Sequence, residues 1–286
     1  MSSDVATIFA ELLRIVEYLR TPLLFLVSLF LGAGGGWLIA GIPFRDHLLD
    51  HPNDRSSHEV PTPRGGGVGI LAAFILAGIS LRIPTHFLFA GILVSCISLY
   101  GDFFRISVRF RLAVQFVSAI ILISPIIVLK GSSFASVSLP VFFVGVLLLV
   151  LFVVATTNFY NFMDGINGIA GLSGAIAFGL LGLYTLYAFP PNGSSNEFSL
   201  LAICVALACL GFLPFNMPRA RVFVGDVGSI LLGFVFASLV IVLSRNYREM
   251  ICLAAILFPF YADELTTMFV RIKAGENLTR PHRSHL

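Results

Sequence analysis

The segment NFYNFMDGINGIAG, residues 158–171, gathers polar side chains between two long apolar runs. It contains three asparagines and one aspartate, although 57% of the residues in the chain are hydrophobic and only 12% are charged. Carboxylate and amide oxygens are ligands that suit a hard cation such as Mg²⁺. Because Mg²⁺ sites are usually completed by substrate phosphates, the segment predicts a site for a divalent cation and a phosphorylated ligand.

Four aspartates come from different parts of the sequence but map to the same predicted membrane face: Asp102, Asp164, Asp226 and Asp263. A carboxylate at the edge of the hydrocarbon needs a partner such as a metal ion or an arginine. Carboxylates, Mg²⁺ and several arginines together are the groups that phosphoryl transfer requires. The alternative is that these aspartates are ordinary helix caps and surface ion pairs.

Glycines flank two of the polar segments. PTPRGGGVGI places Gly65–Gly67 where a loop enters an apolar run, so their backbone amides could approach a phosphate at a helix N-terminus. On spacing alone, close packing of small residues between helices is the favoured interpretation. Asp226 lies between Gly225 and Gly228, which allow a tight approach of another segment at the start of a span.

The chain ends in RPHRSHL, which contains His282, Arg283 and His285. A basic tail after a span is often a topology signal or a contact with anionic lipid. The two histidines three residues apart make a functional role an equally good interpretation.

The elements that must position these residues are membrane spans. Charge-free apolar stretches recur along the chain, and about 20 apolar residues cross a bilayer as a helix. A soluble all-helical protein would not leave so many runs without a charge, so we predict an all-α, polytopic membrane helix bundle of about nine spans. They are expected near residues 22–43, 65–82, 86–101, 112–130, 139–156, 165–188, 198–216, 228–244 and 249–270.

The basic residues predict the orientation of the bundle. With the N-terminus outside, the inner loops hold 12 of the 18 Lys and Arg residues, which places Asp102, Asp164 and Asp226 at the cytoplasmic ends of spans. The expected domains are an N-terminal periplasmic or interfacial segment (1–21), a transmembrane domain (22–270) and a cytoplasmic basic loop (271–286). The four cysteines lie in apolar runs without CxxC spacing, so neither disulfides nor a zinc site is expected.

Five segments in this order resemble the polyprenyl-phosphate N-acetylhexosamine-1-phosphate transferases, a glycosyltransferase family 4-like group. The similarity is greatest to bacterial enzymes that initiate O-antigen or capsule synthesis, and it covers about residues 20–286. The segments are HPNDRSSHEVPTPRGGG, GDFFRISVRFRLAVQ, NFYNFMDGINGIAG, RVFVGDVGSILLGF and RPHRSHL.

The resemblance implies a reaction at the cytoplasmic face of the bacterial inner membrane. A UDP-N-acetyl sugar and a polyprenyl (undecaprenyl) phosphate lipid would give polyprenyl-diphospho-sugar and UMP, with Mg²⁺ as cofactor and Mn²⁺ as the alternative cation. No nucleic-acid partner is expected, and a homodimer is a candidate assembly.

The same resemblance implies roles for individual residues. The catalytic residues would be Asp102, Asp164 and Asp226, and the metal ligands Asp226 and Asn161. Substrate binding would involve Asn158, Asn161, Asn167, Arg111, Arg64, His282, Arg283 and His285.

Two departures from the family pattern matter. Many relatives carry paired aspartates where this chain has Gly101 and Asp102, and their sequences continue beyond the run HRSHL. We therefore expect a transferase that uses Asp102 alone and a final loop that is cut short. The alternatives are an inactive relative that binds a nucleotide sugar or acts as a scaffold, and a transporter, although transporter sites lie near the membrane midplane.

Overall fold

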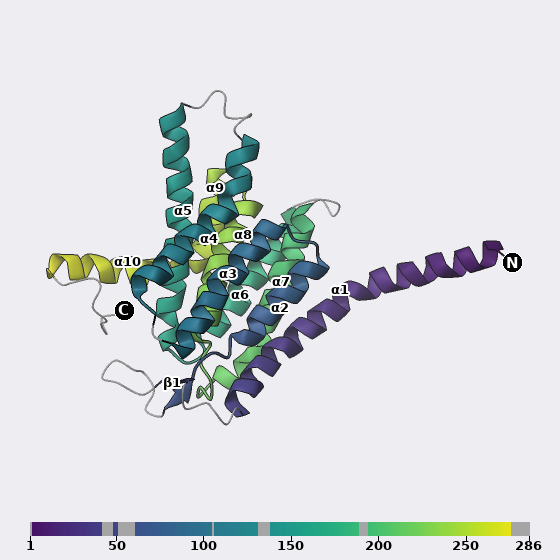
Figure 1. The fold of residues 1–286 in the computed structure, drawn as a ribbon, viewed down its shortest axis with the longest axis horizontal. Helices are drawn as coiled ribbons and strands as arrows, with labels where there is room; N and C mark the ends of the chain where they lie inside the picture. The colour runs from purple at the N-terminus through teal and green to yellow at the C-terminus, as the bar shows by residue number, and fades with distance from the viewer. Residues whose placement is uncertain are drawn as a thin grey trace.

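The computed structural model describes residues 2–41, 48–50, 61–104, 106–130, 138–188 and 194–275. Ten α-helices occupy most of these ranges (Figure 1). They are α1 (Ser2–Gly41), α2 (Val68–Ser80), α3 (Thr85–Phe103), α4 (Val108–Lys130), α5 (Leu139–Phe162), α6 (Ile169–Ala188), α7 (Ser194–Asn216), α8 (Gly225–Leu243), α9 (Tyr247–Ala254) and α10 (Phe258–Lys273).

Short elements complete the described fold. Two 3₁₀ turns, η2 (Met163–Gly165) and η3 (Ala255–Leu257), follow α5 and α9. Strands β1 (Leu49–Asp50) and β2 (Thr62–Pro63) pair antiparallel, with Leu49 opposite Pro63. They form the only sheet in the described ranges, which confirms the predicted all-α class.

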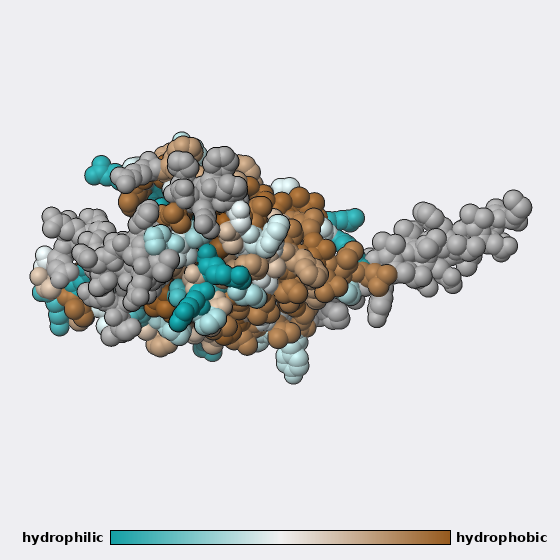
Figure 2. All heavy atoms as spheres, turned by 90° about the horizontal axis from the view of Figure 1, so that it is seen from below, coloured by the Kyte–Doolittle hydropathy of each residue, from teal (hydrophilic) through white to brown (hydrophobic). Residues whose placement is uncertain are grey.

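Eight helical stretches within the described ranges are long and apolar enough to cross a membrane. Helices satisfy their own backbone hydrogen bonds, which is the requirement for crossing a hydrocarbon layer. The chain is therefore a multi-pass membrane protein. Seen from the end that carries β1, hydrophilic side chains gather between hydrophobic surfaces (Figure 2).

The second expected span, residues 65–82, is wrong in length. Helix α2 has only 13 residues, or about 20 Å at the usual rise per residue, against a hydrocarbon core of about 30 Å. The glycine turn at Gly65–Gly67 delays its start, and Arg82, with a positive φ of 55°, follows its end.

Two other expected spans differ in shape. The ninth, residues 249–270, is divided among α9, η3 and α10, and Pro259 stands at the start of α10. Figure 1 shows α10 leaving the bundle sideways. At the N-terminus, α1 runs without a break through Pro22, across the boundary expected after residue 21.

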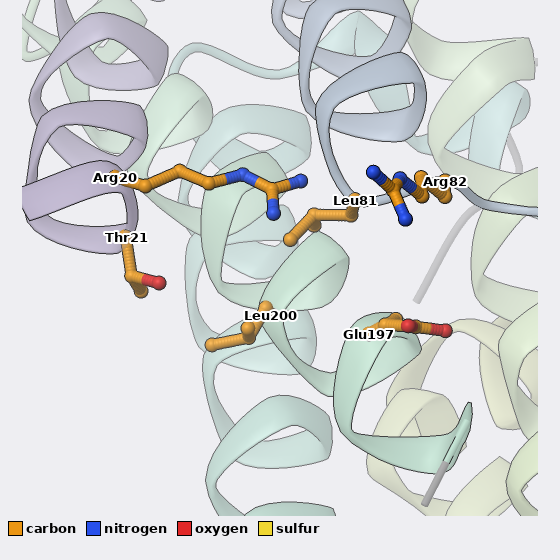
Figure 3. Close-up of a pocket in the computed structure, with 6 residues that line it drawn as sticks. All are labelled: Arg20, Thr21, Leu81, Arg82, Glu197 and Leu200. Carbon is orange, nitrogen blue, oxygen red and sulfur yellow. The ribbon is translucent and has the colours of Figure 1, made fainter. Parts of the chain in front are cut away.

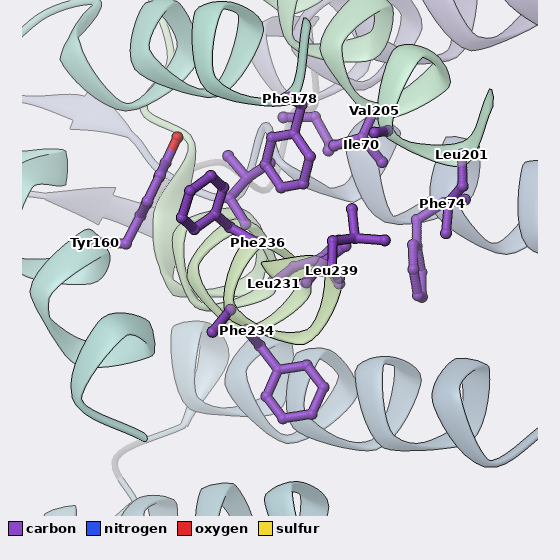
Figure 4. Packing of buried hydrophobic residues seen from close by; sticks show 14 of the residues in the cluster. Ile70, Phe74, Tyr160, Phe178, Leu201, Val205, Leu231, Phe234, Phe236 and Leu239 are labelled. Atoms are coloured by element: carbon purple, nitrogen blue, oxygen red, sulfur yellow. The ribbon is translucent and has the colours of Figure 1, made fainter. Parts of the chain in front are cut away.

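Helix α8 forms the centre of the bundle. Every residue of α8 is buried except Asp226 and Val242, because the helix is apolar on all sides after its first turn. Helices α3 and α5 make its most extensive contacts. Figure 4 shows Phe234, Phe236 and Leu239 pointing in different directions into the surrounding core. The one acidic residue of α8 therefore stands at a fixed point at one end of the bundle.

Candidate functional site

The site is built around the first turn of α8. Gly225 begins the helix with a positive φ of 75°, which glycine adopts without strain. A Cβ on Gly225 would lie 2.5 Å from the backbone nitrogen of Gly65, so the glycine loop passes directly over the helix start. The next residue, Asp226, is partly exposed, whereas Val227 behind it is buried.

Two carboxylates from other elements accept hydrogen bonds from the amides at this helix start. Asp102, at the end of α3, accepts from the backbone nitrogens of Asp226 (3.2 Å) and Val227 (3.1 Å). Asp164, in η2, accepts from Gly225 N at 2.9 Å. The first amides of a helix have no intrahelical acceptors, and negative charge is favourable beside them. Asp102 and Asp164 are therefore caps of α8 supplied by other helices, and they fix its position.

Asp226 makes a different set of contacts. Its carboxylate forms a salt bridge with Arg111 from the first turn of α4 and accepts a hydrogen bond of 2.9 Å from Asn161 in the last turn of α5. The amide nitrogen of Asn161 also donates to Ser229 Oγ at 2.8 Å. The side chains of Arg111 and Asp226 keep 30% and 23% of their accessible surface, so this pair faces solvent.

The glycine loop is a packing element. Gly66 N donates to Phe223 O at 3.0 Å and Gly67 N donates to Val224 O at 2.8 Å, so these amides are already used within the protein. A Cβ on Gly67 would lie 2.4 Å from Gly228 Cα. The packing interpretation is confirmed, and the idea that these amides hold a phosphate does not fit these contacts.

Among the described residues, two polar atoms beside the cluster have no hydrogen-bond partner. Arg64 Nε is buried without a hydrogen bond, and it lies 4.0 Å from Asp102 Oδ1. Asn167 Oδ1 is also buried and unbonded. Buried polar groups nearly always have partners, so both atoms are candidates for contact with water or a ligand.

Asn158 lies one turn before Asn161 on α5 but points to another neighbour. Its amide nitrogen donates to Gln115 Oε1 at 2.6 Å and to the Val154 carbonyl at 2.7 Å. Gln115, a buried residue of α4, did not stand out in the sequence. A lone glutamine within an apolar span is the signal that could have identified it. The Gln115–Asn158 pair holds the site ends of α4 and α5 together.

Asn216 was also missed. Its side chain accepts a hydrogen bond from Gly168 N at 3.0 Å and donates to the Val222 carbonyl at 2.9 Å. These bonds join the turn that carries Asn167 to the segment that leads into α8. Asn216 ends a long apolar run, and its position gave no indication of these partners.

The side chains can be tested for their fit to a divalent cation. Within the described ranges, no three His, Cys, Asp or Glu residues are arranged to hold a metal ion. Mg²⁺ needs no such cage, because one or two protein oxygens, waters and substrate phosphates usually complete its shell. Asp226 with the Asn161 amide fits that limited role, and the Arg111 guanidinium already occupies a cationic position beside Asp226.

Other predicted residues lie apart from this cluster. His282, Arg283 and His285 fall outside the described residues. Asp263 is on α10, a helix that packs against α5 through contacts such as the ring pair Phe159–Tyr261. Of the four aspartates expected at one face, the structure brings Asp102, Asp164 and Asp226 together.

Comparison with known proteins agrees with the family that the sequence motifs resemble. The sequence profile described as glycosyl transferase family 4 matches residues 84–244, more than half of the chain. The decaprenyl-phosphate N-acetylglucosaminephosphotransferase of Mycobacterium leprae is 28% identical over 331 aligned positions, covering 100% of this chain and 82% of that protein. The phospho-N-acetylmuramoyl-pentapeptide-transferase of Staphylococcus saprophyticus is 39% identical over 85 positions, covering 30% of this chain and 25% of that protein.

Proposed function

We propose that this chain, which belongs to glycosyl transferase family 4, transfers an N-acetylamino-sugar 1-phosphate from a UDP-sugar to a polyprenyl phosphate. The products would be polyprenyl-diphospho-sugar and UMP, which makes this a first step of lipid-linked cell-surface glycan synthesis. The supporting observation is the cluster of Asp226, Arg111 and Asn161 at one end of a membrane bundle. The similar mycobacterial protein is named for decaprenyl phosphate.

The proposed reaction exchanges one phosphoanhydride for another. A phosphate oxygen of the polyprenyl phosphate attacks the sugar-bound phosphorus of the donor, and the bond to UMP breaks. A phosphate monoester has a second pKa of about 6 and is largely ionised near neutral pH. The acceptor therefore needs positioning and charge neutralisation more than it needs a base.

Different side chains of the site would provide the positioning and the charge neutralisation. Asp226 and Asn161 would hold the Mg²⁺ ion, which supplies positive charge to the diphosphate oxygens when it is bound. Arg111 would leave its carboxylate partner to contact the diphosphate, and the unbonded Arg64 Nε and Asn167 Oδ1 are available for donor atoms. Asp102 and Asp164 would keep the start of α8, and hence Asp226, in place.

The proposed location is the bacterial inner membrane, with the site facing the cytoplasm. The excess of Lys and Arg at the site end supports that orientation. His282, Arg283 and His285 stay proposed contacts of the sugar phosphate, and a homodimer stays a candidate assembly.

A second candidate function is binding of a nucleotide sugar without turnover. It is favoured by Gly101, where many relatives have an aspartate. A Cβ at this position would lie 4.0 Å from Arg111 Cδ, so the missing carboxylate would have stood beside the arginine that pairs with Asp226.

The decisive experiment is UMP release by the purified full chain with undecaprenyl phosphate, MgCl₂ and a panel of UDP-N-acetyl sugars. We expect release that requires both the lipid and the cation, with one sugar preferred. Binding of the same sugars measured by calorimetry distinguishes the two candidates. Saturable binding with no UMP from a folded protein would support the binder and contradict the transferase.

A further inference from the structure

Figure 3 shows a pocket of the bundle with a volume of about 340 Å³. It lies at the end of the bundle opposite the Asp226 cluster. Chain direction fixes this placement, because α2 leaves the site end at Gly67, beside Gly228, and reaches the pocket at its other end. The pocket lies between α1, the turn after α2 and the start of α7. Its lining residues are Arg20, Thr21, Leu81, Arg82, Glu197 and Leu200.

Two arginines and one glutamate line this pocket. Figure 3 shows the guanidinium groups of Arg20 and Arg82 directed towards each other across Leu81, whereas the carboxylate of Glu197 is directed away from Arg20. In the part of the chain that the structure describes, neither arginine forms a salt bridge. Like charges that face one another repel, and an anion placed between them would be attracted by both.

The backbone conformation of Arg82 is also unusual. Arg82 has a φ of 55° and is the one non-glycine residue with positive φ in the described ranges. This conformation usually favours glycine after a helix and is strained for other residues. Strained backbone conformations cluster at functional sites, which makes Arg82 a candidate binding residue.

The pocket also lies where apolar helices begin or end, and the membrane interface is expected at such positions. Arg20 directly precedes the charge-free apolar run that begins at Thr21, and Glu197 lies in the first turn of α7. Arginine at the ends of spans meets the membrane interface, and its planar guanidinium binds phosphate through paired hydrogen bonds. We propose that this pocket binds the phosphate group of an anionic phospholipid, held between Arg20 and Arg82.

Binding to the purified full chain in neutral detergent tests this proposal. The probes are short-chain phosphatidylglycerol, inorganic phosphate, and diacylglycerol of the same chain length, with affinities measured by native mass spectrometry or thermophoresis. The variants are Arg20→Gln and Arg82→Asn, because asparagine tolerates positive φ. Arg248→Gln is the control, since Arg248 is an exposed arginine in the first turn of α9, outside the pocket.

We expect each pocket variant to weaken phosphatidylglycerol binding about 10-fold, as loss of one charged hydrogen-bond donor predicts, and Arg248→Gln to leave it unchanged. Diacylglycerol should bind weakly and equally to all variants. Unchanged phosphatidylglycerol affinity in Arg20→Gln would overturn the proposal, whatever the stability of Arg82→Asn. If inorganic phosphate bound as well as the lipid, the lipid assignment would be overturned and a free anion site would replace it.

Discussion

The two ends of the helix bundle use their charged side chains differently. At the site end, Asp102, Asp164 and Asp226 come from three elements and meet at the first turn of α8. At the opposite end, Glu249 pairs with Arg245 four residues away in the sequence, at 2.7 Å. Glu249 also accepts a hydrogen bond of 3.0 Å from the hydroxyl of Tyr184 on α6. The aspartates at the site end accept backbone amides of α8 and so fix the first turn of that helix, whereas Glu249 holds the turn before α9 and one tyrosine side chain.

The two kinds of contact should also differ in how much they stabilise the protein. Arg245 keeps 58% of its side-chain surface whereas Glu249 keeps 8%, and solvent screens an ion pair with one exposed partner. Asp102 is buried and accepts two amides from a helix other than its own. Substitutions at the site end should therefore change both the position of α8 and the reaction, whereas those at the other end should change stability alone.

The largest effect is expected from Asp226→Asn, compared with Glu197→Gln. Both acids lie in the first turn of a span, at opposite ends of the bundle. Asp226→Asn removes the charge that pairs with Arg111 and would hold the cation, so UMP release should fall at least about 100-fold. Glu197→Gln should keep its rate. Near-normal turnover in Asp226→Asn would remove the metal assignment.

The second-largest effect is expected from Arg111→Gln, with Arg109→Gln as its matched control. Both arginines lie in the first turn of α4, but Arg109 is exposed and Arg111 meets Asp226. Loss of a charged donor to the diphosphate should lower kcat/KM about 10- to 100-fold, as one charge-assisted hydrogen bond predicts. Equal kinetics in the two variants would assign Arg111 to membrane topology only.

Gly225→Ala tests the close approach over the helix start, and Gly179→Ala is its control. An added Cβ meets Gly65 N at 2.5 Å in the first case and only Ala206 Cβ at 4.0 Å in the second. With the positive φ of Gly225, the first change should cost about 1–3 kcal/mol, seen as a lower melting temperature in detergent. Equal melting temperatures would show that the glycine loop can move away freely.

Asp102→Asn compares a cap between helices with the local pair at the other end. Asparagine keeps one acceptor for the two amides of Asp226 and Val227, so stability should fall by about 1 kcal/mol and turnover several-fold. Glu249→Gln should lower the melting temperature without changing turnover. Unchanged turnover in Asp102→Asn would show that Asp102 has no role in the reaction.

The smallest effect is expected from Gly101→Asp. The new side chain would approach Ile106 Cδ1 at 3.1 Å and reach towards Arg111, so a flexible side chain must shift slightly. Because the acceptor phosphate is already ionised, we expect a rise in UMP release of less than about 10-fold. A rise from no activity to robust turnover would instead support the inactive binder as the state of the natural sequence.

The sequence by itself determined the class of the protein and the types of residue at its site. Hydropathy is carried by each residue, so the apolar runs predicted a helix bundle and most of its spans. Asp226 stood out for its chemistry, the family resemblance implied roles for Asn161 and Arg111, and the structure brings all three together.

The tertiary structure alone decided how the carboxylates divide their roles. Asp102 and Asp226 are the same residue type at the end of a span, yet one caps α8 and the other meets Arg111. Their hydrogen-bond directions depend on how α3 and α8 are placed, which no local pattern encodes. The buried Gln115–Asn158 pair and the convergence of Arg20 and Arg82 have the same origin, because each joins residues far apart in the sequence.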